Sequence, residues 1–191
     1  MLNLYHFVKK TKALGIGERF VIWVQGCNQR CFNCIVPDSW DLNSGTKIKI
    51  DKLVKMVLDS KVEGVTISGG EPFLQSENLT KFIKKLNKHK EINYIVYTGY
   101  KYENLQKNLK YREFLNSIDL LIDGEYIDEL NEDTPFRGSS NQKIYILSQK
   151  GYKLAYDIAN KTSREVEFII KDNEIFMVGI PPKNLNERLL K

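Results

Sequence analysis

Runs of apolar residues that end at a turn recur along the chain, and they predict buried β-strands. Four runs are clear, and a further run is a candidate fifth strand. Each clear run leads directly into glycine or polar residues, as expected where a strand delivers the chain to a loop. The four clear runs are 20–24, 64–68, 93–98 and 119–124, and the candidate is 142–147.

Between these runs, apolar residues repeat at helical spacing. Asp51 is expected to cap a helix that ends near Ser60. Residues 77–89 form the clearest helix, with an apolar stripe opposite several lysines. The stretch after Tyr100, to about Ser117, has a broken helical pattern. This alternation of strands and helices predicts right-handed βαβ units and a parallel sheet.

The length of 191 residues limits the architecture. A complete eight-fold barrel takes about 250 residues. We therefore expect an α/β fold with a partial (β/α) barrel or an open, mostly parallel sheet. Residues 1–150 should form the core, and residues 151–191 a C-terminal extension of the same domain.

The extension carries two β-like runs, over 165–170 and 174–178, that predict a β-hairpin. We expect the hairpin to pack against the sheet edge or a partner. No structure is assigned to residues 1–14. Residues 186–191 are expected to fray or to form a short helix.

Composition and charge narrow the class of protein. The formal net charge is +5, and hydrophobic residues make up 42% of the chain, enough for a real core. The lysines spread over helix faces instead of gathering with stacking aromatics, which predicts a solvated surface and no nucleic-acid partner. No apolar run is long enough for a membrane helix, and no secretory pattern follows Met1. We expect a cytoplasmic protein whose thiols stay reduced.

All three cysteines lie in one stretch, as Cys27, Cys31 and Cys34 with the spacing C-x3-C-x2-C. An odd number of thiols cannot all pair as disulfides, whereas thiolates this close can bind a soft metal centre. A structural zinc site would need a fourth ligand, and neither His6 nor His89 has the usual spacing. Three thiolates on a four-iron cluster would leave one iron open to a ligand.

A second candidate site follows the 64–68 strand, at Gly69, Gly70, Glu71 and Pro72. Glycines at a strand end let the backbone approach a ligand closely. The same residues could form an ordinary turn, with Glu71 a solvated carboxylate. The carboxyl ends of neighbouring strands would bring this turn and the cysteine loop to one cofactor.

Together, the cysteine spacing and the Gly-Gly-Glu-Pro turn resemble the radical S-adenosylmethionine (SAM) superfamily. The resemblance implies that the cysteines hold one [4Fe–4S] cluster, whose open iron binds SAM. It implies that one electron from the cluster cleaves SAM and starts radical chemistry on a substrate. It also implies a SAM site that contains Asn33, Ile35, Ser68, Gly69, Gly70, Glu71 and Thr98, with Glu71 near the amino group of SAM.

Further motifs are similar to the activases of glycyl-radical enzymes, in particular the activators of anaerobic ribonucleotide reductase. These motifs are residues 15–19, 23–27, 37–40, 97–100, 121–124 and 136–142. The resemblance implies a protein substrate whose glycine loses hydrogen, and flavodoxin or ferredoxin as electron donor. Arg137, Ser139, Ser140 and Asn141 could serve the partner, SAM or the carbonyls of their own loop.

Other readings of the same residues remain open. The chain could act on a different protein. It could also act on a small molecule, and it would then need no protein partner. It could also be a non-enzymatic metal-binding or redox-sensing module. Metal content and SAM binding would separate these possibilities.

Overall fold

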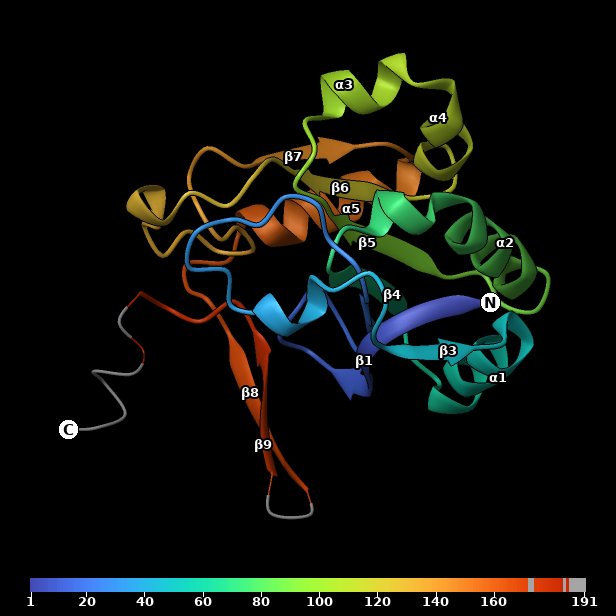
Figure 1. Cartoon of the computed structure of the whole chain (residues 1–191). Helices are drawn as coiled ribbons and strands as arrows, with labels where there is room; N and C mark the ends of the chain where they lie inside the picture. The colour runs from blue at the N-terminus through green and yellow to red at the C-terminus, as the bar shows by residue number, and fades with distance from the viewer. Residues whose placement is uncertain (172–173, 184, 186–191) are drawn as a thin grey trace.

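The strands expected from the apolar runs lie side by side in the computed structural model, which describes residues 1–171, 174–183 and 185 (Figure 1). Within these residues, seven strands form one mixed sheet in the order β3-β1-β2-β4-β5-β6-β7. The four central strands are parallel, whereas β1 is antiparallel to both β2 and β3, and β7 is antiparallel to β6. The strands are β1 (Leu2–Thr11), β2 (Arg19–Val24), β3 (Thr46–Ile48), β4 (Gly64–Gly69), β5 (Asn93–Tyr97), β6 (Leu120–Asp123) and β7 (Lys143–Ile146).

Helices connect the parallel strands and cover the sheet. The predicted helix over 77–89 is confirmed, and the broken pattern that follows it forms two short helices. A further helix after β7, which the sequence pattern did not predict, packs against β6 and β7. The helices are α1 (Ile50–Ser60), α2 (Ser76–Asn87), α3 (Tyr102–Lys107), α4 (Leu109–Leu115) and α5 (Gln149–Ala159).

Alternate side chains of each strand enter two different cores, because successive residues of a strand point to opposite faces. On one face, Ile22 and Val96 pack with Phe82 of α2 and Phe114 of α4. On the other face, Ile122 packs with residues of α5 in a smaller cluster. Both faces are therefore covered, as expected for parallel strands that read as continuous apolar runs.

The hairpin predicted in the C-terminal extension is confirmed as β8 (Val166–Lys171) and β9 (Glu174–Gly179). Its base packs on the sheet, where Phe176 and Val178 join the cluster of Val21 and Trp23. Its far end extends away from the body (Figure 1). The helix or frayed end expected for residues 186–191 lies outside the described residues.

Two expectations need correction. The sequence predicted no structure for residues 1–14, but they contain β1. Pairing with β2 and β3 stabilises this strand, although its own apolar pattern is weak. Asp51 is not the N-cap of α1, since the helix begins one residue earlier and Lys49 takes that position. Asp51 lies in the first turn, where a negative charge suits the helix dipole, and it pairs with Lys85 of α2.

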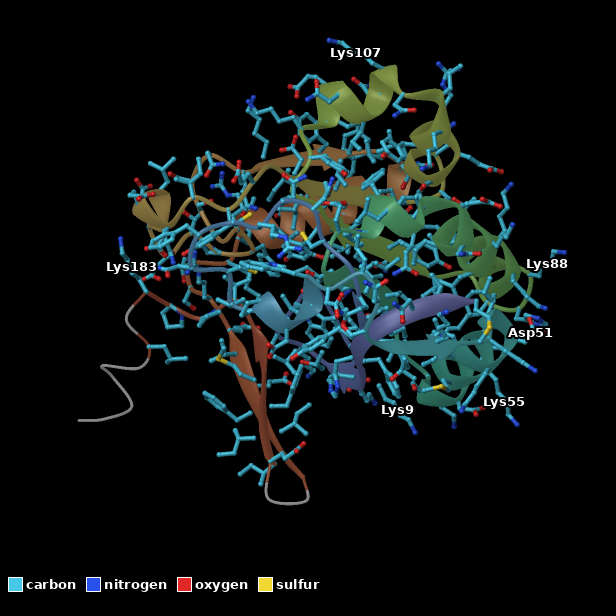
Figure 2. The ribbon with its side chains drawn as sticks, viewed as in Figure 1. Lys9, Asp51, Lys55, Lys88, Lys107 and Lys183 are labelled. Atoms are coloured by element: carbon cyan, nitrogen blue, oxygen red, sulfur yellow. The ribbon has the colours of Figure 1, made fainter. Side chains whose placement is uncertain are left out.

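The lysine-rich helix faces are exposed, as the sequence predicted. Lys81, Lys84 and Lys85 lie on the outer side of α2, where each pairs with a carboxylate. Figure 2 shows Lys55 and Lys88 pointing away from the body at the surface. Among the helices described, none has the length and apolar character needed to cross a membrane.

Candidate active site at the strand ends

The carboxyl ends of the parallel strands lie together at one end of the sheet, and the candidate site lies there. Strand β2 leads to the cysteine loop, β4 to Gly69 and Gly70, and β5 to Thr98. The loops after these strands line one cavity of about 920 Å³, including the space at its mouth.

The cysteine loop is closed at its base by the residues that follow it. The Gly26 N–H donates to the Ser39 carbonyl at 2.8 Å, and the Cys27 N–H donates to the Trp40 carbonyl at 3.1 Å. The buried Gln25 side chain supports this closure, because its amide donates to the carbonyls of residues 38 and 41 at 3.0 and 2.8 Å. The Pro-Asp-Ser-Trp segment thus gives the loop a fixed shape.

Two residues inside the loop have left-handed backbone conformations, Arg30 and Asn33, both with φ of 54°. This region is unfavourable for most side chains and better tolerated by asparagine. The Arg30 guanidinium carbon lies 5.5 Å from the centre of the Trp40 ring, a cation–π contact that helps hold this turn. These turns bring Cys27, Cys31 and Cys34 to the wall of the same cavity.

The three thiols line one cavity, where they can hold a metal centre. In the described residues, no three Cys, His, Asp or Glu side chains converge on one ion position. A mononuclear zinc site needs such convergence, whereas in a cubane each thiolate binds its own iron. Burial raises the pKa of the Cys27 and Cys31 thiols, so metal binding would have to displace their protons.

Gly69 and Gly70 allow the end of β4 to touch the cysteine loop. Gly69 has φ of 102°, a conformation that favours glycine. A Cβ on Gly70 would stand 2.2 Å from the carbonyl oxygen of Gly26, a backbone atom that cannot move aside easily. The Glu71 N–H donates to that same oxygen at 2.8 Å. The Gly-Gly pair therefore joins the two predicted motifs into one site.

The Glu71 side chain is buried and fully engaged by the protein. Its Oε1 accepts from the Phe73 N–H at 2.9 Å and from the Thr98 hydroxyl at 2.8 Å, while Oε2 accepts from the Gly99 N–H at 2.9 Å. Burial raises the pKa of Glu71 to about 7, although all three hydrogen bonds favour the charged form. Glu71 thus ties the β4 turn to the end of β5, and a contact with the amino group of SAM stays a prediction.

Most of the SAM-site residues expected from the resemblance line this cavity together with the cysteines. They are Ile35, Ser68, Gly69, Gly70, Glu71 and Thr98. Asn33 is not among the lining residues, and its amide donates to the Asp128 carboxylate at 3.1 Å. Asn33 therefore connects the cysteine loop to the loop after β6.

The 137–141 segment makes contacts within its own loops. The Arg137 guanidinium donates to the Gln142 carbonyl at 3.0 Å, and the Asn141 amide donates to the Glu125 carbonyl at 2.8 Å. The Ser139 hydroxyl accepts from the Ile127 N–H at 3.1 Å, and the Ser140 N–H donates to a backbone carbonyl. These contacts order the segment's own loops, and a contact of these residues with SAM or a partner stays a prediction.

The cavity wall also contains residues from the C-terminal extension, which sequence reasoning missed. Ile180 and Pro181 line it beside Gly138. The Arg164 side chain, 2% exposed, holds this segment by donating to the Pro181 carbonyl at 2.7 Å and the Gly138 carbonyl at 3.0 Å. No local signal could have found them, because the Ile-Pro-Pro sequence reads as a strand terminator.

Known proteins with similar sequences identify the family of this chain. Residues 13–145 match the family described as 4Fe-4S single cluster domain. The chain is similar to the anaerobic ribonucleoside-triphosphate reductase-activating protein of Enterobacteria phage T4, with 31% identity over 69% of this chain and 85% of that protein. The protein of the same name from Pasteurella multocida is 33% identical over 78% of this chain and 99% of its own length. The pyruvate formate-lyase-activating enzyme of Clostridium pasteurianum is 35% identical over 60% of this chain and 49% of its own length.

Proposed function

The chain belongs to the 4Fe-4S single cluster domain family and, within it, to the radical SAM activases of glycyl-radical enzymes, and from this premise we propose that it generates a glycyl radical on an anaerobic ribonucleoside-triphosphate reductase. It is an oxidoreductase that uses one [4Fe–4S] cluster and SAM. The observation that supports this best is the single cavity lined by Cys27, Cys31 and Cys34 on one side and Gly69 and Gly70 on the other.

We assign the cluster to the three cysteines and the SAM site to the strand-end loops. When bound, the cluster supplies the electron that cleaves SAM and so leads to removal of hydrogen from the substrate glycine. The chain's own part is to bind and orient. The closed cysteine loop fixes the thiols, and the glycines at positions 69 and 70, which carry no side chain, let the polar end of SAM approach the backbone closely. Ile180 and Pro181 add apolar surface to one wall of the cavity.

The remaining expectations form part of the same proposal. The mixed sheet supports a partial barrel of the radical SAM type, with its core within residues 1–150 and an extension from 151 to 191. Flavodoxin or ferredoxin would supply the electron. We place the protein in the cytoplasm, because a cluster held by three thiolates needs a reducing, oxygen-poor environment.

An anaerobic assay tests the function directly. The iron-reconstituted protein would be incubated with dithionite, SAM and the anaerobic reductase of the same organism. We expect 5′-deoxyadenosine and a glycyl-radical doublet in the electron paramagnetic resonance spectrum of the reductase. Cys31→Ala should abolish both, with the fold checked by circular dichroism. A wild-type protein that cleaves SAM while the reductase stays without a radical would refute the assigned substrate.

A further inference from the structure

The β8–β9 hairpin has two apolar faces, because apolar residues follow one another without polar alternation over 168–170 and 175–178. One face is the inner face, defined here by Ile169, Phe176 and Val178. It packs on the sheet, where the Phe176 ring lies 5.4 Å from the Trp23 ring and Val178 is completely buried. Glu167 adds a polar anchor by accepting from the Thr11 hydroxyl at 2.6 Å. The inner face therefore accounts for the attachment of the hairpin.

The outer face consists of Val166, Phe168, Ile170, Ile175 and Met177, and it contains no charged residue. Phe168 pairs with Met177 across the hairpin, and Ile170 pairs with Ile175, so the apolar side chains form adjacent pairs. Phe168, Ile170 and Ile175 are 46%, 75% and 70% exposed. Antiparallel strands normally place polar residues on the solvent side. A contiguous exposed apolar patch of this kind indicates a surface that another molecule covers.

The outer face comes near the active-site cavity at its Met177 end. Met177 and Gly179 line a second, smaller cavity together with Ile35 and Val36 of the cysteine loop. Ile35 is 56% exposed, directly follows Cys34, and also lines the active-site cavity. A macromolecule whose reacting residue enters the active-site cavity can therefore contact the outer face at its Met177 end and extend along it.

We propose that the outer face of the β8–β9 hairpin is a docking surface for the protein substrate, and that it meets an apolar patch of that partner next to the substrate glycine. The proposal rests on the proposed function, because only a protein substrate spans both the cavity and the hairpin. The hairpin lies beyond residue 145, where the match to the cluster-domain family ends. The alignment with the Pasteurella relative also leaves about a fifth of this chain without a counterpart. The hairpin therefore lies outside the matched cluster domain.

The test replaces the two most exposed residues of the outer face, in the variant Ile170→Lys/Ile175→Lys. The matched control is Tyr152→Lys/Tyr156→Lys on α5, where the side chains are 67% and 71% exposed and lie outside the proposed surface. Reconstituted proteins would be assayed for the KM of the anaerobic reductase in glycyl-radical formation. Partner-free SAM cleavage, the SAM-induced change in the cluster spectrum and the sedimentation coefficient would be measured in parallel.

We expect the hairpin variant to raise the KM for the reductase by about tenfold or more, since buried interface anchors commonly cost that much when lost. Partner-free SAM cleavage should stay unchanged, and the control should match the wild type. An unchanged KM would overturn the docking proposal alone. A wild-type dimer that the variant converts to a monomer, with an unchanged KM, would show that a second copy covers the face. Failure of the wild type to form any radical on the reductase would refute the proposed function and the docking proposal together.

Discussion

Arg164 offers the sharpest test of how the extension serves the site. Its guanidinium donates to the carbonyls of residues 134, 137, 138 and 181 at 3.1, 2.6, 3.0 and 2.7 Å, and it pairs with the Asp133 carboxylate at 3.2 Å. One side chain thus joins the 133–138 loop to Pro181 in the cavity wall. We predict that Arg164→Ala releases the segment that carries Pro181.

The magnitude follows from burial and from the number of contacts. The Arg164 side chain is 2% exposed but its partner Asp133 is 40% exposed, so the cost comes mainly from the backbone carbonyls that would lose their donor. A hydrogen bond to a charged group contributes about 1.5–3 kcal/mol, and removal of one partner of a buried charged network costs about 3–5 kcal/mol. The local opening of the extension should therefore become more frequent by on the order of 100- to 1,000-fold. Arg164→Lys should recover only part of this, since an ammonium cannot span the same acceptors.

Amide hydrogen exchange measures this opening directly. Protection of β8 and β9 should fall, while β4 and β5 should keep theirs, and the dissociation constant for SAM should rise because Ile180 and Pro181 no longer cover the cavity. The matched control is Lys161→Ala, which removes a half-exposed ion pair with Glu165 and should change stability by less than about 1 kcal/mol. Unchanged exchange in β8 and β9 of Arg164→Ala would refute the reasoning.

Three further predictions concern the site and the fold beneath it. Gly70→Ala should weaken SAM binding and lower the iron content, because the added Cβ would clash with the Gly26 carbonyl. Calorimetry measures the SAM affinity and iron analysis measures the cluster content. Wild-type values for both would contradict the prediction. The Glu71 carboxyl has a folded pKa of about 7, above its unfolded value of about 4.5, so it binds more protons in the folded state. Its contribution to the free energy of unfolding is therefore fully present below about pH 4.5 and is lost as the pH rises to about 7, a change of about 3 kcal/mol. Urea unfolding of the cluster-free protein at several pH values should show this loss in the wild type and not in Glu71→Gln. Parallel pH profiles for the two proteins would count against the prediction. Arg19→Met should lower the free energy of unfolding by about 1–3 kcal/mol for each buried acceptor left unpaired. The buried guanidinium donates to the Thr66 hydroxyl at 2.6 Å and to the Asn93 amide oxygen at 2.7 Å. A thermal unfolding midpoint equal to that of the wild type would rule this out.

The core strands and the chemistry at their ends could be predicted from the sequence because their signals are local. The run of residues 20–24 and its parallel neighbours are buried on both faces, so they stay apolar without interruption and end at recognisable turns. The spacing of the cysteines alone predicts a metal centre, since eight consecutive residues contain Cys27, Cys31 and Cys34. The same holds for Gly69 and Gly70, which follow a strand directly.

Long-range contacts decided the rest. Strand β1 exists because β2 and β3 pair with it on both sides, and its own sequence carries no clear period. Asn33 donates to Asp128, a residue that only the fold brings near. Ile180 and Pro181 reach the cavity through the hydrogen bonds of Arg164, across separations that no local pattern encodes. The sequence by itself determined which groups perform the chemistry, because spacing and periodicity act between near neighbours. Only the tertiary structure decided how the cavity is enclosed, because enclosure depends on segments that meet after folding.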